Sequence, residues 1–456
     1  MPVSITWYRR HQKGWSCTFA AQLLVAGMML PGLARGDNPI DRTIVICQKI
    51  LRVRPDDASM YYRLGDAYIQ KGRETGDITY YQLASQALQH SLKIEPDLGP
   101  AQRHLAYVFY SLHNFAGAAR EADQAIAVDP LDSNAYGVLG DAQLETGQYA
   151  AAARTYATMA AIKDDLYSYS RRSGLETIRG EDADAIADLK RAIADGQRDG
   201  APAEAIAWAN TRLAEDYFLL GRLGEAAVQD QAALRAYPGY YRALASLGQV
   251  RAAQGRLDAA ATLYRGAIAV IPLPEYAVAL GDVYTKLGRP QDAQRQRELV
   301  EFIARLNVIN RVIYNRVLVD YYADHDIEHD RAIELAAGEF KTRRDIYGQD
   351  ALAWSLYRGD KASEALPHII AALQFGTTDA RLYFHAGMIY AALGRKDLAR
   401  TDLARALAIN PHFQPILDQV AAQEYAALGG ALNPQACVSA IRSRHDVDVK
   451  RRPQDD

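Results

Sequence analysis

The stretch Ala380–Pro411, "ARLYFHAGMIYAALGRKDLARTDLARALAINP", decides the fold, because its spacing of small, aromatic and proline residues recurs along the chain. Its marked positions are Tyr383, Gly387, Tyr390, Gly394, Ala399, Leu403, Ala406 and Pro411. The stretches Tyr241–Pro272 and Gly99–Pro130 repeat the spacing. Corresponding starts fall near residues 58, 99, 133, 166, 207, 241, 274, 312, 346 and 380, and six of the nine intervals measure 33 or 34 residues.

Each unit of this pattern fits two antiparallel helices. Small residues such as Gly387 and Ala399 belong where two helices touch most closely, since a larger side chain would push the pair apart. Gly394 suits a left-handed cap that ends the first helix. Pro411 stops the second helix, because proline lacks the N–H that a helix interior needs. The pattern therefore predicts an all-α chain of stacked helix pairs.

The marked positions and their period resemble the tetratricopeptide repeat (TPR) family, whose repeat is about 34 residues long. The resemblance covers about residues 58–413. It implies a right-handed α-α superhelical solenoid of about ten helix pairs. Arrays of this kind serve many partners, so the resemblance is specific for the fold and says little about one function.

The pattern divides the chain into six segments. They are a signal peptide (1–34), a leading half-repeat helix (35–57), repeats 1–4 (58–200), repeats 5–10 (201–413), a capping helix (414–430) and a polar tail expected to be disordered (431–456). Two departures from the period stand out. The stretch Gly72–Leu83 adds about seven residues, which we place between the two helices of the first repeat. Glycine and proline are absent from Gln291 to Tyr322, which predicts a long second helix in the seventh repeat.

The first 34 residues have the three parts of a secretory signal. A basic patch that includes Arg9 and Arg10 precedes the apolar run Cys17–Leu30, and Gly32 and Ala34 offer a cleavage site. We therefore expect export to the periplasm of a bacterial cell, with cleavage after Ala34 and no stable membrane insertion afterwards. The alternative is an inner-membrane anchor formed by residues 16–33.

Composition and motifs limit the function. The net charge of −3 lacks the basic excess that nucleic-acid binding requires, so we expect no nucleic-acid partner. The sequence contains no P-loop, no G-x-S-x-G, no H-E-x-x-H and no paired C-x-x-C. No nucleophile stands with a base and an orienting carboxylate, so we expect no catalytic residues, no cofactor and no enzymatic activity.

The stretch Asp324–Asp330, "DHDIEHD", looks most like a metal site. In the repeat pattern it is the turn between the two helices of the eighth repeat. Acidic residues suit the start of a helix, where N–H groups lack partners. We expect His325 and His329 to lie in an exposed, flexible corner and to tolerate replacement by serine, with no metal bound. A metal-handling protein that uses this turn is the alternative.

The first helices of stacked repeats line the concave face of such an array. Residues of mixed charge and aromatic character are expected to project there, namely Tyr62, Asp66, Arg103, Tyr107, Tyr110, Asp141, Glu145, Trp208, Glu215, Asp282, Arg316, Asp320, Tyr347 and Tyr357. Nine of these form the predicted partner-binding groove, namely Tyr62, Asp66, Arg103, Tyr107, Tyr110, Asp141, Glu145, Arg316 and Asp320. Aromatic side chains beside an arginine and carboxylates suit an extended peptide with apolar and basic groups.

The sequence thus predicts a non-enzymatic TPR scaffold of the cell envelope that binds a protein or peptide partner in its concave groove. Within the same class, the chain resembles the TPR components of exopolysaccharide or envelope secretion machines, in which such an array organises export. The sequence does not name the partner.

Overall fold

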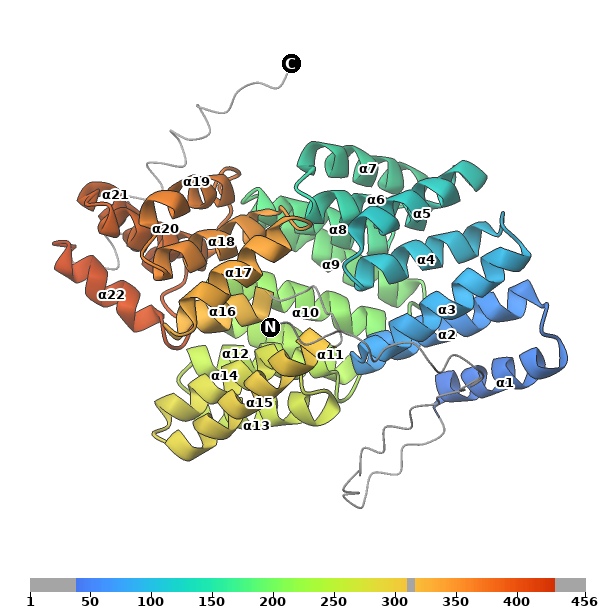
Figure 1. Cartoon of the computed structure of the whole chain (residues 1–456), viewed down its shortest axis with the longest axis horizontal. Helices are drawn as coiled ribbons and strands as arrows, with labels where there is room; N and C mark the ends of the chain where they lie inside the picture. Colours follow the sequence, from blue (N-terminus) through green and yellow to red (C-terminus); the bar gives the residue numbers. More distant parts are fainter. Residues whose placement is uncertain (1–37, 310–315, 431–456) are drawn as a thin grey trace, which may run out of the picture. The chain divides into compact units, whose positions relative to one another are not determined.

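The computed structural model describes residues 38–309 and 316–430, which form α-helices joined by short turns and no strand (Figure 1). The helices are α1 (Pro39–Val53), α2 (Ala58–Thr75), α3 (Ile78–Ile94), α4 (Gly99–Ser111), α5 (Phe115–Val128), α6 (Ser133–Glu145), α7 (Tyr149–Ile162), α8 (Leu166–Ile178), α9 (Asp182–Arg198), α10 (Ala203–Leu219), α11 (Leu223–Ala236), α12 (Tyr241–Ala253), α13 (Leu257–Val270), α14 (Pro274–Lys286), α15 (Pro290–Ile309), α16 (Arg316–Asp324), α17 (His329–Phe340), α18 (Ile346–Arg358), α19 (Ala362–Ala372), α20 (Ala380–Ala392), α21 (Lys396–Ile409) and α22 (Asp418–Ala427).

The helices pack as consecutive antiparallel pairs, which confirms the superhelical solenoid that the repeat predicts. The even-numbered helices α2 to α20 are the first helices of ten pairs, and the odd-numbered helices α3 to α21 are the second helices. Each second helix except α15 also packs closely on the first helix of the next pair. Helix α15 contacts α16 through side chains, among them Val300 and Tyr322, so the core is continuous along the stack. Helix α1 precedes the first pair and packs on α2, and α22 follows the tenth and packs on α21.

Small residues stand where the two helices of a pair cross. A Cβ added at Gly387 of α20 would lie 2.6 Å from the Leu403 side chain of α21. The same close approach occurs between Gly65 and Leu88, also at 2.6 Å. Atoms cannot approach so closely without displacement, so glycine sets the distance between the two helices of a pair.

The two departures from the period lengthen helices. The extra residues of the first repeat extend α2 to 18 residues and α3 to 17, and only Gly76 and Asp77 separate the two helices. Our expectation of an insertion between the helices was wrong, because the extra residues continue the two helices and Asp77 caps α3 through its side chain. The long second helix expected in the seventh repeat is α15, with 20 residues.

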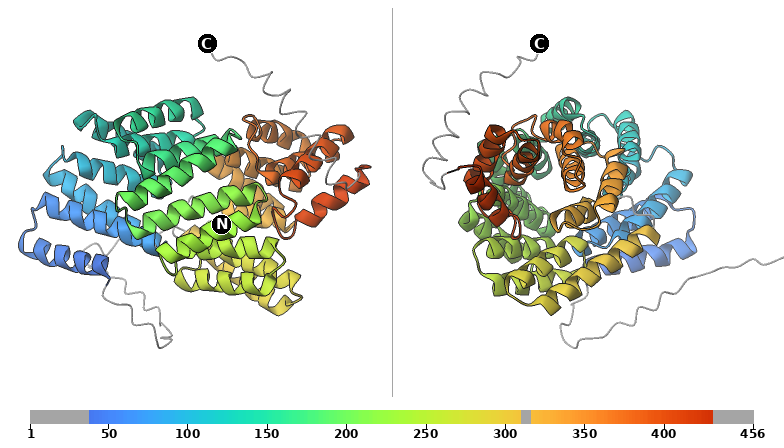
Figure 2. Two further views of the ribbon diagram at one scale, coloured as in Figure 1. Left: turned by 180° about the vertical axis from the view of Figure 1, so that it is seen from behind. Right: turned by 60° about the vertical axis from the view of Figure 1, so that its left-hand side comes forward.

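Distant repeats also touch each other. The backbone N–H of Arg344 donates to the carbonyl of Glu145 at 3.0 Å, and the N–H of Ile346 donates to the Tyr149 hydroxyl at 2.7 Å. The Asn410 side chain donates to the carbonyl of Phe218 at 2.7 Å. The orange and red helices α17 to α21 accordingly lie beside the green helices α7 to α10 in both views (Figure 2). The solenoid therefore packs on itself after five repeats.

Two segments predicted from the sequence fall outside this part of the chain. The signal peptide or anchor of residues 1–34 and the tail of residues 431–456 lie beyond the described residues. Among the helices that are described, none combines the length and apolar character needed to cross a membrane.

Candidate functional site: an inner cavity of the array

The first helices of repeats 3 to 10 enclose a cavity of about 640 Å³, which we call the inner cavity. Its size falls in the range of pockets that hold small ligands or side chains of a partner. Leu144 of α6, Ile178 of α8, Phe218 of α10 and Val278 of α14 supply apolar surface. Because α18 to α21 pack against α7 to α10, the cavity is bounded by repeats from both halves of the array.

Charged residues line the inner cavity, and acids outnumber bases. The carboxylates are Glu145, Glu215, Glu275, Asp282, Asp320, Asp324, Asp345 and Asp379, and the guanidinium groups are Arg212, Arg343 and Arg381. All three guanidinium groups pair with carboxylates. Arg212 Nη1 lies 2.5 Å from Glu215 Oε2, Arg381 Nη1 lies 3.2 Å from Asp320 Oδ2, and Arg343 pairs with Glu145. The lining therefore carries more carboxylates than cations, although Asp345 and Asp282 also pair with Arg316 and His325, which lie outside it.

The pKa values of these acids reflect the cost of burying charge. Burial raises the pKa of Asp320 to about 6, although the Arg381 guanidinium opposes the shift. Burial likewise raises the pKa of Glu145, against the charge of Arg343. Burial thus makes the negative charge of these groups costly, and a cation brought into the cavity would offset that cost.

Glu275 stands apart from the other acids. It is the second residue of α14, and it makes no hydrogen bond or ion pair with another side chain in the part of the chain that the structure describes. Burial raises the pKa of Glu275, while its own backbone N–H and the charge of Arg242 lower it. A smaller cavity of about 310 Å³ shares Glu215 and Glu275 with the inner cavity and includes Arg242. Glu275 is thus placed to receive a cationic group from a ligand.

Two residues of the predicted groove, Glu145 and Asp320, line the inner cavity. Of the further residues expected on the concave face, Glu215, Asp282 and Tyr347 line it as well. A partner-binding role for any of them stays a prediction.

Other groove residues lie in earlier repeats and contact each other. His104 Nε2 lies 3.1 Å from Asp66 Oδ1, and the His104 ring meets the Tyr62 ring edge-on with centroids 5.1 Å apart. Arg103 Nη1 lies 3.0 Å from Asp132 Oδ2. These side chains form part of the packing between repeats 1, 2 and 3, and they do not line the inner cavity.

The remaining groove residues make contacts between repeats. The rings of Tyr107 and Tyr81 lie 6.3 Å apart, and the Tyr110 hydroxyl donates to Glu145 at 3.4 Å. Asp141 accepts hydrogen bonds from the Tyr156 hydroxyl at 2.8 Å and from Arg171 Nε at 2.9 Å.

Arg316 is almost fully buried. Its guanidinium lies 2.7 Å from Asp345 Oδ1 and 3.3 Å from Glu339 Oε1. It therefore links α16 to α17 and to the N-cap of α18, and it does not line the inner cavity.

Among the charged residues of this surface that the sequence analysis missed are Arg242, Glu275 and Arg381. A signal for them was present, because each is the second residue of its repeat, as are Trp208 and Tyr347, which were recognised. Arg343 had no such signal, since it lies in the connection after α17 and reaches Glu145 from a repeat five units away.

The Asp324–Asp330 stretch is the turn between α16 and α17, as expected. The structure corrects the expectation for His325, however. Its Nε2 lies 2.7 Å from Asp282 Oδ1 and its Nδ1 lies 2.8 Å from the Tyr321 carbonyl oxygen, so the ring is fixed. Burial lowers the pKa of His325, but the hydrogen bond and charge of Asp282 outweigh burial and raise it. Within residues 38–309 and 316–430, no three His, Cys, Asp or Glu side chains are grouped to hold a metal.

Replacing His325 with serine is now expected to lower the free energy of unfolding by about 1–3 kcal/mol, because Asp282 is buried and would lose its partner. His329→Ser is the control. Its side chain is 39% exposed and pairs with the exposed Asp326, so the change should stay within about 0.5 kcal/mol. Urea unfolding of both variants measures the difference. Equal effects would show that the Asp282 contact contributes nothing to stability.

Comparisons with known proteins agree with the helix pairs. Family models described as tetratricopeptide repeat match residues 48–89, 104–168, 211–277 and 380–413. The first and the last of these ranges contain the helix pairs with the Gly65–Leu88 and Gly387–Leu403 contacts described above. The chain is a tetratricopeptide repeat protein. Proteins of this family are typically scaffolds without catalytic activity, and their fold generally serves protein interaction.

Several solved structures of other proteins are similar to this chain. The TPR protein TTC0263 of Thermus thermophilus is 23% identical, with 40% of this chain and 92% of that chain covered and a TM-score of 0.35. PilW, a type IV pilus biogenesis factor, is 18% identical, with 46% and 93% covered and a TM-score of 0.38. A human IFIT1 dimer with PPP-AAAA is 16% identical, with 74% and 77% covered and a TM-score of 0.43. No curated protein matches the chain significantly.

Proposed function

We propose that this TPR protein is a non-enzymatic scaffold of the cell envelope that holds a basic segment of a partner protein in its inner cavity. The observation that carries the proposal is the charge of the cavity, which eight carboxylates and three guanidinium groups line. Carboxylates on low-dielectric walls concentrate a negative potential and attract cations. Lysine or arginine side chains of a peptide would meet them, while Leu144, Phe218 and Val278 offer apolar contact.

The envelope location rests on the sequence of residues 1–34, with its basic patch, apolar run and small-residue cleavage site. Export would bring the array into contact with envelope proteins. Sequencing the N-terminus of the mature protein tests this part, and it is expected to begin near Arg35. Recovery of soluble protein that retains residues 1–34 from the cytoplasm would contradict export.

Removing two negative charges from the cavity should weaken partner binding without weakening the fold. The test variant combines Glu215→Gln and Glu275→Gln. Burial raises the pKa of Glu275, so its charge costs stability. Glu215 pairs with Arg212, but both side chains are partly exposed and Arg212 keeps Asp216 at 3.6 Å, so the melting temperature of the double variant is expected to stay near the parental value. Capture of the partner by crosslinking in cells, followed by mass spectrometry, should fall roughly tenfold or more.

The matched control removes two charges elsewhere. Asp258→Asn with Glu364→Gln changes exposed carboxylates on the second helices α13 and α19, and capture should stay at the parental level. Equal capture by the cavity variant and the control would contradict the proposed site. A cavity variant with a much lower melting temperature would show that these acids hold the fold, in which case the site would have to be placed elsewhere.

A further inference from the structure

The cavity of about 310 Å³ that contains Glu215, Arg242 and Glu275 is a recess in the wall of the inner cavity, and we call it the side cavity. It lies between α10, α12 and α14, the first helices of repeats 5, 6 and 7. Its volume falls at the lower end of the range for pockets that hold small molecules. The side cavity therefore has the size of a site for one compact ligand.

Small residues between aromatic rings leave this space open. Ala245 of α12 and Ala279 of α14 line the side cavity, and each fills only the volume of a methyl group. The rings of Tyr264 and Tyr276 line it as well, and both rings belong to the hydrophobic core of repeats 5 to 7. Packing in that core holds the walls of the side cavity in place.

One face of α12 supplies three polar side chains to the side cavity. Arg242, Ser246 and Gln249 are spaced by four and three residues, which returns to the same side of a helix. The Ser246 hydroxyl is already bonded, since it lies 2.9 Å from Asp230 Oδ2. Arg242 and Gln249 therefore remain for a ligand.

Arg242 has no carboxylate partner among the residues that the structure describes. Its Nε donates to the Tyr241 hydroxyl at 3.1 Å, which orients the guanidinium and leaves both Nη groups available. The three guanidinium groups that line the inner cavity, those of Arg212, Arg343 and Arg381, all pair with acids. Arg242 is thus an oriented cation whose planar N–H groups match the geometry of a carboxylate.

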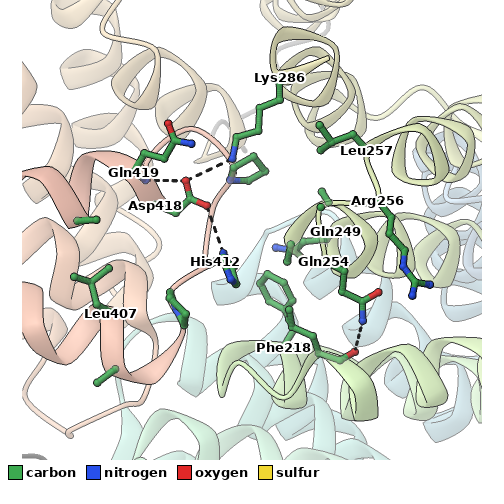
Figure 3. Close-up of a pocket in the computed structure, with 18 residues that line it drawn as sticks. Phe218, Gln249, Gln254, Arg256, Leu257, Lys286, Leu407, His412, Asp418 and Gln419 are labelled. Carbon is green, nitrogen blue, oxygen red and sulfur yellow. Dashed lines mark hydrogen bonds and ion pairs between the residues drawn. The ribbon is translucent and has the colours of Figure 1, made fainter. Parts of the chain in front are cut away.

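Gln249 supplies an amide that also makes no hydrogen bond within residues 38–309 and 316–430. It lines the side cavity and the inner cavity, and it borders a third cavity of about 1200 Å³ near α22. Figure 3 shows Gln249 in that third cavity without a bond to the residues drawn. An amide donates through its nitrogen and accepts through its oxygen, so Gln249 can bind either end of a polar ligand.

Glu275 supplies a negative charge from α14. It makes no ion pair with Arg242 or with any other side chain in the described part of the chain. Burial raises the pKa of Glu275, and the charge of Arg242 opposes that shift. Both are the second residue of a first helix, in successive repeats. The side cavity therefore holds a cation and an anion that lie near each other without touching.

These two charges select the ligand. Glu215 adds a carboxylate, but Arg212 lies 2.5 Å from it and balances its charge. A simple cation would be repelled by Arg242, and a simple anion such as phosphate would be repelled by Glu275. A molecule with one group of each sign satisfies both side chains. The α-amino acids are compact molecules of this kind, because they carry an ammonium and a carboxylate group on one carbon atom.

We propose that the side cavity binds a free α-amino acid, with its carboxylate on Arg242 and its ammonium group on Glu275. The amide of Gln249 adds a hydrogen bond, and the side chain of the amino acid extends toward the inner cavity. This is a small-molecule site beyond the proposed binding of a partner protein. Amino-acid binding requires no partner, so the purified protein tests it separately from the proposed function.

Binding to the full chain is the first measurement. The proteinogenic L-amino acids are screened one at a time for a rise in melting temperature, because a ligand that binds the folded state stabilises it. Isothermal titration calorimetry then measures those that raise it. At least one should bind in a 1:1 ratio with a Kd of about 1 mM or tighter. Absence of binding by every one of them at about 10 mM would overturn the proposal.

Derivatives of the bound amino acid test the two charges in the unaltered protein. The carboxamide keeps only the ammonium group, and the N-acetyl form keeps only the carboxylate. Each should bind at least tenfold more weakly, because it leaves Arg242 or Glu275 without a partner. An equal affinity of the carboxamide would mean a site for simple cations, and an equal affinity of the N-acetyl form a site for simple anions. Either result would refute the amino-acid site.

A charge-removing variant locates the site. Arg242→Gln should weaken amino-acid binding at least tenfold. The control Arg265→Gln removes the same charge from an exposed position of α13 and should bind like the parent. Unchanged affinity in Arg242→Gln, or an equal loss in both variants, would place the ligand elsewhere. Arg242→Gln keeps all carboxylates of the inner cavity, so capture of a basic partner should persist, and the two proposals can fail independently.

Discussion

Replacing Gly387 with leucine is expected to destabilise the array by about 1–3 kcal/mol or more, one of the two largest effects we predict. The added Cβ alone would lie 2.6 Å from Leu403 Cγ and 3.2 Å from the Leu403 backbone nitrogen. The leucine side chain would extend further into a core that Phe384 and Ala406 already fill. Helices α20 and α21 would have to move apart, and the displacement would pass to α22.

The control for this substitution is Gly338→Leu. Gly338 lies in the interior of α17, is exposed, and has no atom within 4 Å of an added Cβ. Leucine has a higher helix propensity than glycine, so this change should be neutral or stabilise by up to about 1 kcal/mol. Thermal unfolding followed by circular dichroism compares the two. A Gly387→Leu protein as stable as the Gly338→Leu protein would mean that the close helix contact does not determine the packing.

Arg316→Ala is expected to have the second large effect, a loss of about 3–5 kcal/mol. The side chains of Arg316, Asp345 and Glu339 are 10%, 8% and 7% exposed, so removing the arginine would leave two carboxylates without their shared cation in a buried position. Asp345 also caps α18 by accepting the N–H of Gly348 at 2.8 Å. The substitution would therefore loosen the junction of α16, α17 and α18.

An exposed ion pair provides the comparison. Arg400 and Asp397 lie 2.9 Å apart within one helix, with side chains 46% and 91% exposed, so Arg400→Ala should cost at most about 0.5 kcal/mol. Denaturant unfolding of both variants gives the two values. If Arg316→Ala lowered the free energy of unfolding no more than Arg400→Ala does, the buried contacts of Arg316 with Asp345 and Glu339 would be no stronger than an exposed ion pair.

The repeat was predictable from sequence because its determinants are local. Gly387 marks a helix contact and Gly394 a helix end in the tenth repeat, and small residues and turn residues return at the same spacing along the chain. The turn at Asp324–Asp330 followed from this pattern alone. The contact that fixes His325 could not be predicted from the pattern, because its partner Asp282 lies in the preceding repeat, 43 residues away.

The inner cavity could be predicted only in part, for a geometric reason. The position within the repeat identified Glu145, Glu215 and Asp320 as residues of the concave face. The same criterion would also have identified Glu275 and Arg381. The pairing of Glu145 with Arg343 depends on how far the superhelix turns over five repeats. That rotation is the sum of small angles between neighbouring repeats, which the sequence of one repeat does not reveal.

A photoactivatable crosslinking residue at Val278, used in living cells, tests the central claim most directly. Val278 lies on α14 and lines the inner cavity beside Glu275. Leu398, on α21 and 46% exposed, is the matched outer position. The account predicts that Val278 crosslinks to one segment of one partner, that this segment is rich in lysine or arginine, and that Leu398 does not capture it. Capture of the same proteins from both positions, or none from Val278, would contradict it.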